Sequence, residues 1–197
     1  MTGTVELKVP GSADWIPGKK GSRVLPNTVI STGFRSTALL AVGDSTIAVQ
    51  PLTRLSLEEL IKQAGTERAS LNLHTGRIRA QVAPPAAGSI EFSVRSPMAT
   101  ASVRGTAFNF DTLNLEVRKG AVSFAPAIQG TASSRPVLVR AGESSRIDAD
   151  SGRVLSPQAA AETSRTPPAL PGREAAAALK TAVPQGSLAV QVTLESE

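Results

Sequence analysis

Glycine residues recur along most of this chain at a spacing that limits what it can fold into. Many neighbours in the series are separated by ten to twelve residues, which is enough for one short strand and one turn. The series comprises Gly11, Gly21, Gly33, Gly43, Gly65, Gly76, Gly88, Gly120, Gly130, Gly142 and Gly152. It predicts about a dozen short strands.

Between the glycines, apolar residues alternate with polar ones. Period two is typical of strands that bury one face. The clearest examples are Ile78, Ala80 and Val82; Ile90, Phe92 and Val94; Leu113, Leu115 and Val117; and Val137, Val139 and Ala141. Before residue 156 the sole helical pattern is residues 57–63 (LEELIKQ), where we expect a turn or two of helix. We therefore predict an all-β fold.

The arrangement of these strands has two candidate forms. A weak period of ten to twelve residues, or of twenty-odd for paired strands, is compatible with a β-helix-like roll. Since no side-chain motif repeats with this period, a sandwich remains an alternative. The expected β domain covers residues 1–156.

Composition changes after residue 156. Residues 157–186 are rich in proline and alanine and are expected to form a linker, with a candidate short helix at 173–180. Residues 187–197 then alternate as a single strand, which needs a partner because an unpaired strand promotes aggregation. It either returns to an edge of the main domain or begins a further domain, and we favour the second.

Composition also excludes several kinds of site. The apolar share of 41% indicates a globular chain, and the net charge of +5 is scattered rather than gathered in a basic run, which argues against a nucleic-acid surface. With no cysteine there is no disulfide, thiolate nucleophile or zinc–sulfur site. Aromatic residues at 3% leave little for base or sugar stacking. No apolar run reaches bilayer length and no signal-peptide core is present.

Residues 96–108 (SPMATASVRGTAF) contain a break in the alternation. Inward positions before Gly105 are odd-numbered and those after it are even-numbered, so we predict a bulge at residues 104–106. The glycine would supply a positive φ or a close approach. We expect Arg104 to be structural, its guanidinium binding carbonyls or a carboxylate, with anion binding as the functional alternative.

This segment resembles the FecR family of bacterial extracytoplasmic sensor domains. The residues that match its signature are Ser96, Pro97, Ala99, Val103, Arg104, Gly105, Thr106 and Phe108. Upstream matches are Trp15, Gly21, Leu25, Ile30, Thr32, Gly33, Ser36, Asp44, Ser45, Pro51, Leu52 and Thr53, and downstream matches are residues 119–122 and 141–143. Together they span about residues 5–147.

The resemblance implies an envelope sensor domain that has no enzymatic activity and no cofactor. Family members that regulate sigma factors also resemble a three-part protein with a cytoplasmic helical segment and one membrane helix. Neither segment is present in this sequence, so the anti-sigma role is not carried over. Localisation is expected to be periplasmic or otherwise extracytoplasmic, with any export signal outside the given sequence.

Other chemistries have little support. His74 is the one histidine, and without a G-x-S-x-G elbow we expect it to cap a turn or lie exposed. Glu58 and Glu59 are expected to point apart on a solvated helical turn. Residues 148–152 (DADSG) lack the later acids of a calcium loop and are expected to form a tight turn. Residues 18–21 do not form a phosphate loop.

A candidate basic binding face depends on which strands are neighbours. Arg77 and Arg79 lie on the polar side of a predicted strand, and with Arg95 and Arg118 they would form a basic stripe if their strands are adjacent. Such residues more often form the solvated side of a sheet.

Two functions follow from these observations. The first is a non-enzymatic module that senses or scaffolds through contacts with an envelope or membrane protein, its edge strands offering the docking surface. The alternative is a module that binds cell wall or anionic polysaccharide, favoured by the positive charge.

Overall fold

The computed structural model describes residues 3–63, 65–84, 88–127, 135–160 and 188–194, and all regular structure in these ranges is β-strand. The all-β prediction is confirmed. Within the same ranges there is no helix with the length and apolar character needed to cross a membrane.

The strands of the described ranges form two sheets of nine. Sheet A has the order β15 (Val137–Arg140), β14 (Ala121–Pro126), β11 (Ala99–Val103), β10 (Ser89–Arg95), β8 (Thr66–Thr75), β7 (Arg54–Gln63), β4 (Val29–Thr32), β1 (Val5–Lys8) and β2 (Ile16–Pro17). Sheet B has the order β17 (Gln158–Ala159), β16 (Glu143–Arg146), β13 (Asn114–Lys119), β12 (Ala107–Asp111), β9 (Arg77–Gln81), β6 (Ser45–Val49), β5 (Ser36–Val42), β18 (Leu188–Leu194) and β3 (Ser22–Val24).

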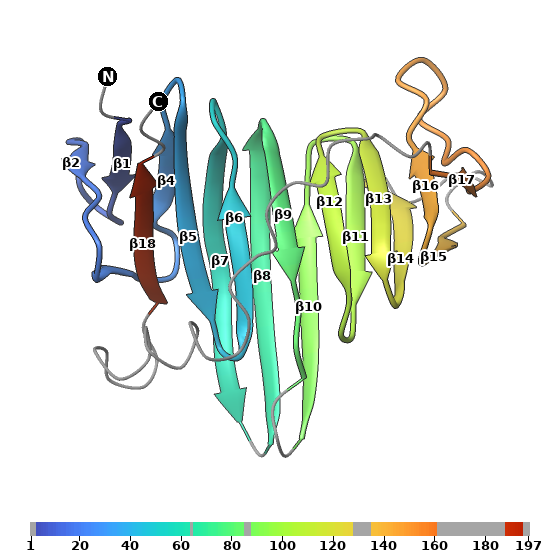
Figure 1. Cartoon of the computed structure of the whole chain (residues 1–197), viewed down its shortest axis with the longest axis horizontal. Coiled ribbons are helices and arrows are strands. Elements are labelled where there is room, and N and C mark those ends of the chain that lie inside the picture. Colours follow the sequence, from blue (N-terminus) through green and yellow to red (C-terminus); the bar gives the residue numbers. More distant parts are fainter. Residues whose placement is uncertain (1–2, 64, 85–87, 128–134, 161–187, 195–197) are drawn as a thin grey trace.

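The chain winds between the two sheets as it advances along the long axis of the molecule (Figure 1). After β4 in sheet A it contributes β5 and β6 to sheet B, β7 and β8 to sheet A, β9 to sheet B, and so on to β17. Pairing is antiparallel except between β8 and β10, which β9 separates in sequence. The fold therefore combines the two forms that the sequence left open: two sheets lie face to face, and the chain is wound through them as in a roll.

The core lies between the sheets and is built from the predicted alternation. Ile78 and Ala80 of β9 and Phe92 and Val94 of β10 are at most 1% exposed. Phe110 of sheet B meets Phe124 of sheet A edge to face, with ring centroids 6.0 Å apart. Such an aromatic pair contributes packing between layers beyond the area that it buries.

The helical turn predicted at residues 57–63 is wrong, because these residues belong to strand β7. The pairing with β8 shifts between Leu57 and Glu59, so Glu58 is an extra residue opposite β8. This bulge changes the parity of the strand. Leu57 and Leu60 consequently share the spacing of a helix face although both lie in a strand.

The C-terminal region is described in two parts. Within the expected linker, Gln158 and Ala159 form β17, which pairs with β16, whereas the candidate helix at 173–180 lies outside the described residues. The backbone of β18 pairs with β5 on one side and with β3 on the other, at the N-terminal end of sheet B (Figure 1). The domain boundaries expected at residues 156 and 186 stay predictions.

Candidate functional site

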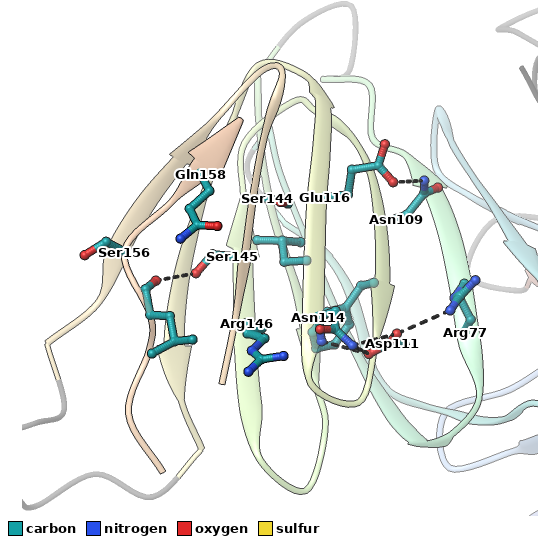
Figure 2. Close-up of a pocket in the computed structure, with 13 residues that line it drawn as sticks. Arg77, Asn109, Asp111, Asn114, Glu116, Ser144, Ser145, Arg146, Ser156 and Gln158 are labelled. Atoms are coloured by element: carbon teal, nitrogen blue, oxygen red, sulfur yellow. Dashed lines mark hydrogen bonds and ion pairs between the residues drawn. The ribbon is translucent and has the colours of Figure 1, made fainter. Parts of the chain in front are cut away.

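A polar hollow of about 520 Å³ lies on the outer face of sheet B, over the strands from β9 to β17 (Figure 2). Outward positions of these strands supply most of its lining, since inward positions such as Phe108 and Val117 belong to the core. The polar lining residues are Arg77, Asn109, Asp111, Asn114, Glu116, Ser144, Ser145, Arg146, Ser156 and Gln158.

Both carboxylates of the hollow are occupied by neighbouring groups. Asp111 Oδ1 accepts hydrogen bonds from the backbone N–H groups of Leu113 (2.9 Å) and Asn114 (2.7 Å), and its Oδ2 lies 3.5 Å from Arg77 Nη2. Glu116 accepts a bond of 2.9 Å from Asn109 Nδ2. These acids therefore hold the β12–β13 hairpin together through Asn109, Asn114 and Arg77. The other polar groups of the lining include the hydroxyls of Ser144 and Ser156, the amide of Gln158 and the guanidinium of Arg146.

Three of the four arginines of the candidate basic face lie on sheet B. Arg77 and Arg79 lie on β9 and Arg118 on β13, with β12 between these strands. Partial burial, and then the positive charge of Arg118, lower the pKa of Arg79, and Glu116 opposes this shift. Arg95 lies on β10 of sheet A and does not join them.

The first part of the signature forms a turn fixed by a buried hydroxyl. Ser96 is 5% exposed, accepts a hydrogen bond of 3.0 Å from Ala99 N–H, and donates one of 2.8 Å to the carbonyl of Thr112. It thereby joins the β10–β11 turn of sheet A to the β12–β13 turn of sheet B. Pro97 is exposed at the tip of this turn, and Ala99 is buried.

The second part of the signature is where the chain crosses between sheets. Val103 ends β11 in sheet A and Ala107 begins β12 in sheet B, so the parity slip reflects a crossing at residues 104–106 rather than a bulge inside one strand. Gly105 has φ +121°, a conformation that glycine adopts readily. An irregularity in pairing does occur directly afterwards, between Ala107 and Phe108.

The environment of Arg104 differs from the expected structural role. Its side chain is exposed and lines a second hollow of about 540 Å³ on the outer face of sheet A. Among the described residues, no hydrogen bond or ion pair holds its guanidinium. Val103 and Phe108 on either side of the crossing are buried in the core.

Other residues singled out from the sequence lie apart from the hollow. His74 is exposed on β8, with Nε2 at 3.0 Å from Ser56 Oγ. Glu58 and Glu59 lie in β7, where Glu58 accepts a bond of 3.2 Å from Ser70 Oγ. Across the described ranges, no group of acidic or histidine side chains has a geometry suited to a metal ion.

The turn predicted at residues 148–152 is present. Asp148 Oδ1 accepts the N–H groups of Asp150 (3.0 Å) and Ser151 (3.4 Å), and Gly152 has φ +65°. These backbone hydrogen bonds lower the pKa of the Asp148 carboxyl group. The Asp148 carboxylate thus stabilises the turn by accepting backbone hydrogen bonds.

Comparisons with known proteins agree with this architecture. The family model described as FecR protein matches residues 28–123. Two crystal structures of a proposed anti-sigma factor from Parabacteroides distasonis each align with a TM-score of 0.52 and 16% identity, covering 66% of this chain and 59% of that one. This chain thus spans about three-fifths of the length of those structures, and the likeness concerns the fold. Among curated protein sequences, no match was found.

Proposed function

We propose that this chain, whose residues 28–123 belong to the FecR family, is a non-enzymatic sensing or scaffolding module that binds an envelope protein on the extracytoplasmic side. Proteins of this family are envelope-associated regulators, which supports a role in signalling. The engagement of Asp111 and Glu116 by neighbouring groups supports a binding role over an acid–base one.

The observation that carries this proposal is the edge strand β15. Among the described strands of sheet A its one partner is β14, and it is longer than the edge strands β2, β3 and β17. Ala141 N–H donates to Gly120 carbonyl, so by antiparallel alternation the N–H and carbonyl of Leu138 point away from β14. An edge with such groups accepts an added strand from a partner.

The side chains of β15 restrict where that strand would add. Leu138 is 48% exposed and offers apolar contact. The N–H of Arg140 already donates to Glu143 Oε2 at 2.7 Å, so it is closed to a partner. Docking would therefore centre on Leu138.

The test places a photo-crosslinking residue at Arg140 and irradiates the protein in its native envelope. We expect one discrete envelope protein to be captured. Leu138→Pro removes the outward N–H without breaking a bond to β14 and should abolish capture, whereas the matched Leu138→Ser retains the N–H and should only weaken it. Capture of nothing but further copies of this chain would overturn the proposal.

A second candidate function, binding of an anionic polysaccharide, is favoured by the polar hollow of sheet B. Arg77 and Arg146 face it together with asparagine, serine and glutamine side chains, a lining suited to hydroxyl and carboxylate groups. Retention on purified cell wall that falls with salt, and that Arg146→Ser reduces more than Arg23→Ser on β3, is the expected result. Equal recovery with and without wall material would exclude this function.

A further inference from the structure

Two large apolar side chains are displayed to solvent on neighbouring turns. Phe34 is 71% exposed and Leu52 is 61% exposed, more than any other large apolar side chain in the described ranges. The N–H of Leu52 donates to the carbonyl of Gly33 at 3.2 Å, so the two turns are in contact. We name residues 33–35 and 50–53 the Phe34–Leu52 knob.

Both turns use a backbone conformation that is unfavourable for their residues. Arg35 has φ +54° and Leu52 has φ +56°, in the left-handed region that bulky residues rarely occupy. Residues in this region persist where surrounding structure holds them, and they are concentrated at functional sites. Since neither side chain packs into the core, this conformation serves to present Phe34 and Leu52 outward.

Buried hydroxyls hold the second turn. Thr32 is 3% exposed, and its hydroxyl donates to the carbonyl of Gln50 at 2.6 Å while accepting the N–H of Thr53 at 3.0 Å. Thr53 is 1% exposed, and its hydroxyl accepts the N–H of Arg77 at 2.9 Å. The turn that carries Leu52 is therefore held by hydrogen bonds from the buried hydroxyls of Thr32 and Thr53.

The first turn is fixed in a similar way. Ser36 is fully buried, accepts the N–H of Thr4 at 2.6 Å and donates to the carbonyl of Phe34 at 3.2 Å. The N–H of Gly33 donates to the carbonyl of Thr4 at 2.8 Å. An apolar side chain on a pre-organised turn loses little entropy when it binds a partner.

A shallow hollow of about 540 Å³ adjoins Leu52 and extends to Leu113. Its lining includes Gly76, where a Cβ atom would lie 2.5 Å from Thr53 Cα, so this position must be glycine. The absence of a side chain there leaves room beside Leu52. The surface thus offers an apolar projection and an adjacent recess.

The charged side chains of the two turns and of the strand ends beside them are positive. In residues 31–35 and 50–54 they are Arg35 and Arg54, both exposed. The adjoining recess is lined by one charge of each sign, Arg77 and Asp111, which form an ion pair at 3.5 Å. The Arg35 guanidinium lies 5.7 Å from the centre of the Phe34 ring. A partner with carboxylates beside its apolar residues would complement this arrangement.

We propose that the Phe34–Leu52 knob is a docking site for a protein segment that carries large apolar side chains next to aspartate or glutamate. The apolar groups would pack on Phe34, on Leu52 and in the recess over Gly76, and the acids would face Arg35 and Arg54. This inference rests on the proposed function, because both assume that the chain binds a protein. The surface is a different one, since the knob does not include β15.

The test selects binders from a displayed library of short random peptides on the full chain, with subtraction on the double variant Phe34→Ser/Leu52→Ser. We expect selected peptides to combine large apolar residues with Asp or Glu and to bind the double variant about tenfold more weakly. Arg35→Gln should weaken binding and flatten its salt dependence. The matched control Ile61→Ser, which alters an exposed apolar residue at the end of β7, should bind as the unaltered protein does.

Three outcomes would overturn the inference: equal binding to the double variant, selected peptides without acidic residues, or photo-crosslinks from position 34 that join only copies of this chain. If the double variant does not fold, a photoreactive residue at position 34 in the otherwise unaltered chain must crosslink the selected peptides. The crosslinking experiment on β15 uses a probe at Arg140, which is not part of the Phe34–Leu52 knob. A negative result for the knob therefore does not contradict the proposal for β15, and a negative result for β15 does not contradict the proposal for the knob.

Discussion

The two bends of the signature segment use different chemistry. At residues 96–98 the buried hydroxyl of Ser96 bonds to Ala99 N–H and to the Thr112 carbonyl. At residues 104–106 the backbone conformation of Gly105 makes the bend, and the Thr106 hydroxyl is buried without a hydrogen-bond partner in the described part of the chain. One bend is held by polar bonds and the other by backbone freedom and packing.

This difference separates residues of the signature that build the fold from one that does not. Ser96 and Gly105 each satisfy a local requirement of a bend. Arg104 lies between them and meets no such requirement, since its side chain is exposed and lines a hollow on sheet A. Substitutions at Ser96, Gly105, Thr106 and Arg104 should therefore change the free energy of unfolding by different amounts and with different signs.

The largest loss of stability is expected for Ser96→Ala. The variant leaves the Ala99 N–H and the Thr112 carbonyl without their partner in a buried site, which should lower the free energy of unfolding by roughly 2–3 kcal/mol. Denaturant unfolding of the purified protein measures it. Ser102→Ala, at an exposed position of β11, is the control and should change the free energy of unfolding little; equal losses would show that the Ser96 bonds contribute nothing.

A smaller loss is expected for Gly105→Ala. A φ of +121° is strained for alanine, while the stiffer unfolded chain offsets part of the effect, so we expect a loss of about 1–2 kcal/mol. A Cβ atom would meet Pro84 only at 3.4 Å, so the effect is one of backbone conformation.

Gly142→Ala is the control for this comparison. Its φ of +80° is nearer the left-handed region that other residues can occupy, and no atom lies within 4 Å of the added Cβ. A thermal or denaturant unfolding series should therefore rank Gly142→Ala as the milder change. The reverse order would contradict the assignment of the bend to Gly105.

For Thr106→Val the expected sign is opposite. The substitution replaces a buried hydroxyl, for which the described residues supply no hydrogen-bond partner, by a methyl group of similar size, so the free energy of unfolding should rise by up to about 1 kcal/mol. The same substitution at Thr53, whose hydroxyl is bonded to the backbone of Arg77, should destabilise the protein. A clear loss for Thr106→Val would mean that its hydroxyl is bonded after all.

The smallest effect is expected for Arg104→Ala. Since the side chain is exposed, the free energy of unfolding should change by less than about 0.5 kcal/mol. Denaturant unfolding of this variant and of Ser96→Ala, measured side by side, tests whether Arg104 has the structural role expected from the sequence. A loss as large as that of Ser96→Ala would restore the structural role expected from the sequence.

The sequence predicted most of the strands and inward residues, because alternation is a local property. Ile78 and Phe92, for example, are buried as expected, whereas Ala141 lies beyond the end of β15 and is exposed. The error at residues 57–63 has a local cause, since the bulge at Glu58 gives Leu57 and Leu60 the spacing of a helix face. The sequence also shows the change from odd-numbered to even-numbered inward positions at Gly105. A crossing between sheets and a bulge within one strand produce the same change in the alternation, so the sequence alone does not distinguish them.

The candidate site was harder to predict because it depends on which sheet each strand joins. Arg118 lies near enough to Arg79 on sheet B for its positive charge to lower the pKa of Arg79, although the two are far apart in sequence, and Arg95 is removed from them because β10 belongs to sheet A. Asn114, Arg146 and Gln158 of the hollow were missed for the same reason. Their outward positions are visible in the alternation of the sequence, but their neighbours are not.

The position of β18 determines when one end of the molecule can be completed. In sheet B, the described partner of β3 is β18, through pairs such as Val24 with Leu188. A chain emerging from the ribosome would therefore make β3 early and hold it without a neighbour in that sheet until residues 188–194 arrive. Pairing over so large a sequence separation is slow, so the N-terminal end, although synthesised first, should be the last to close.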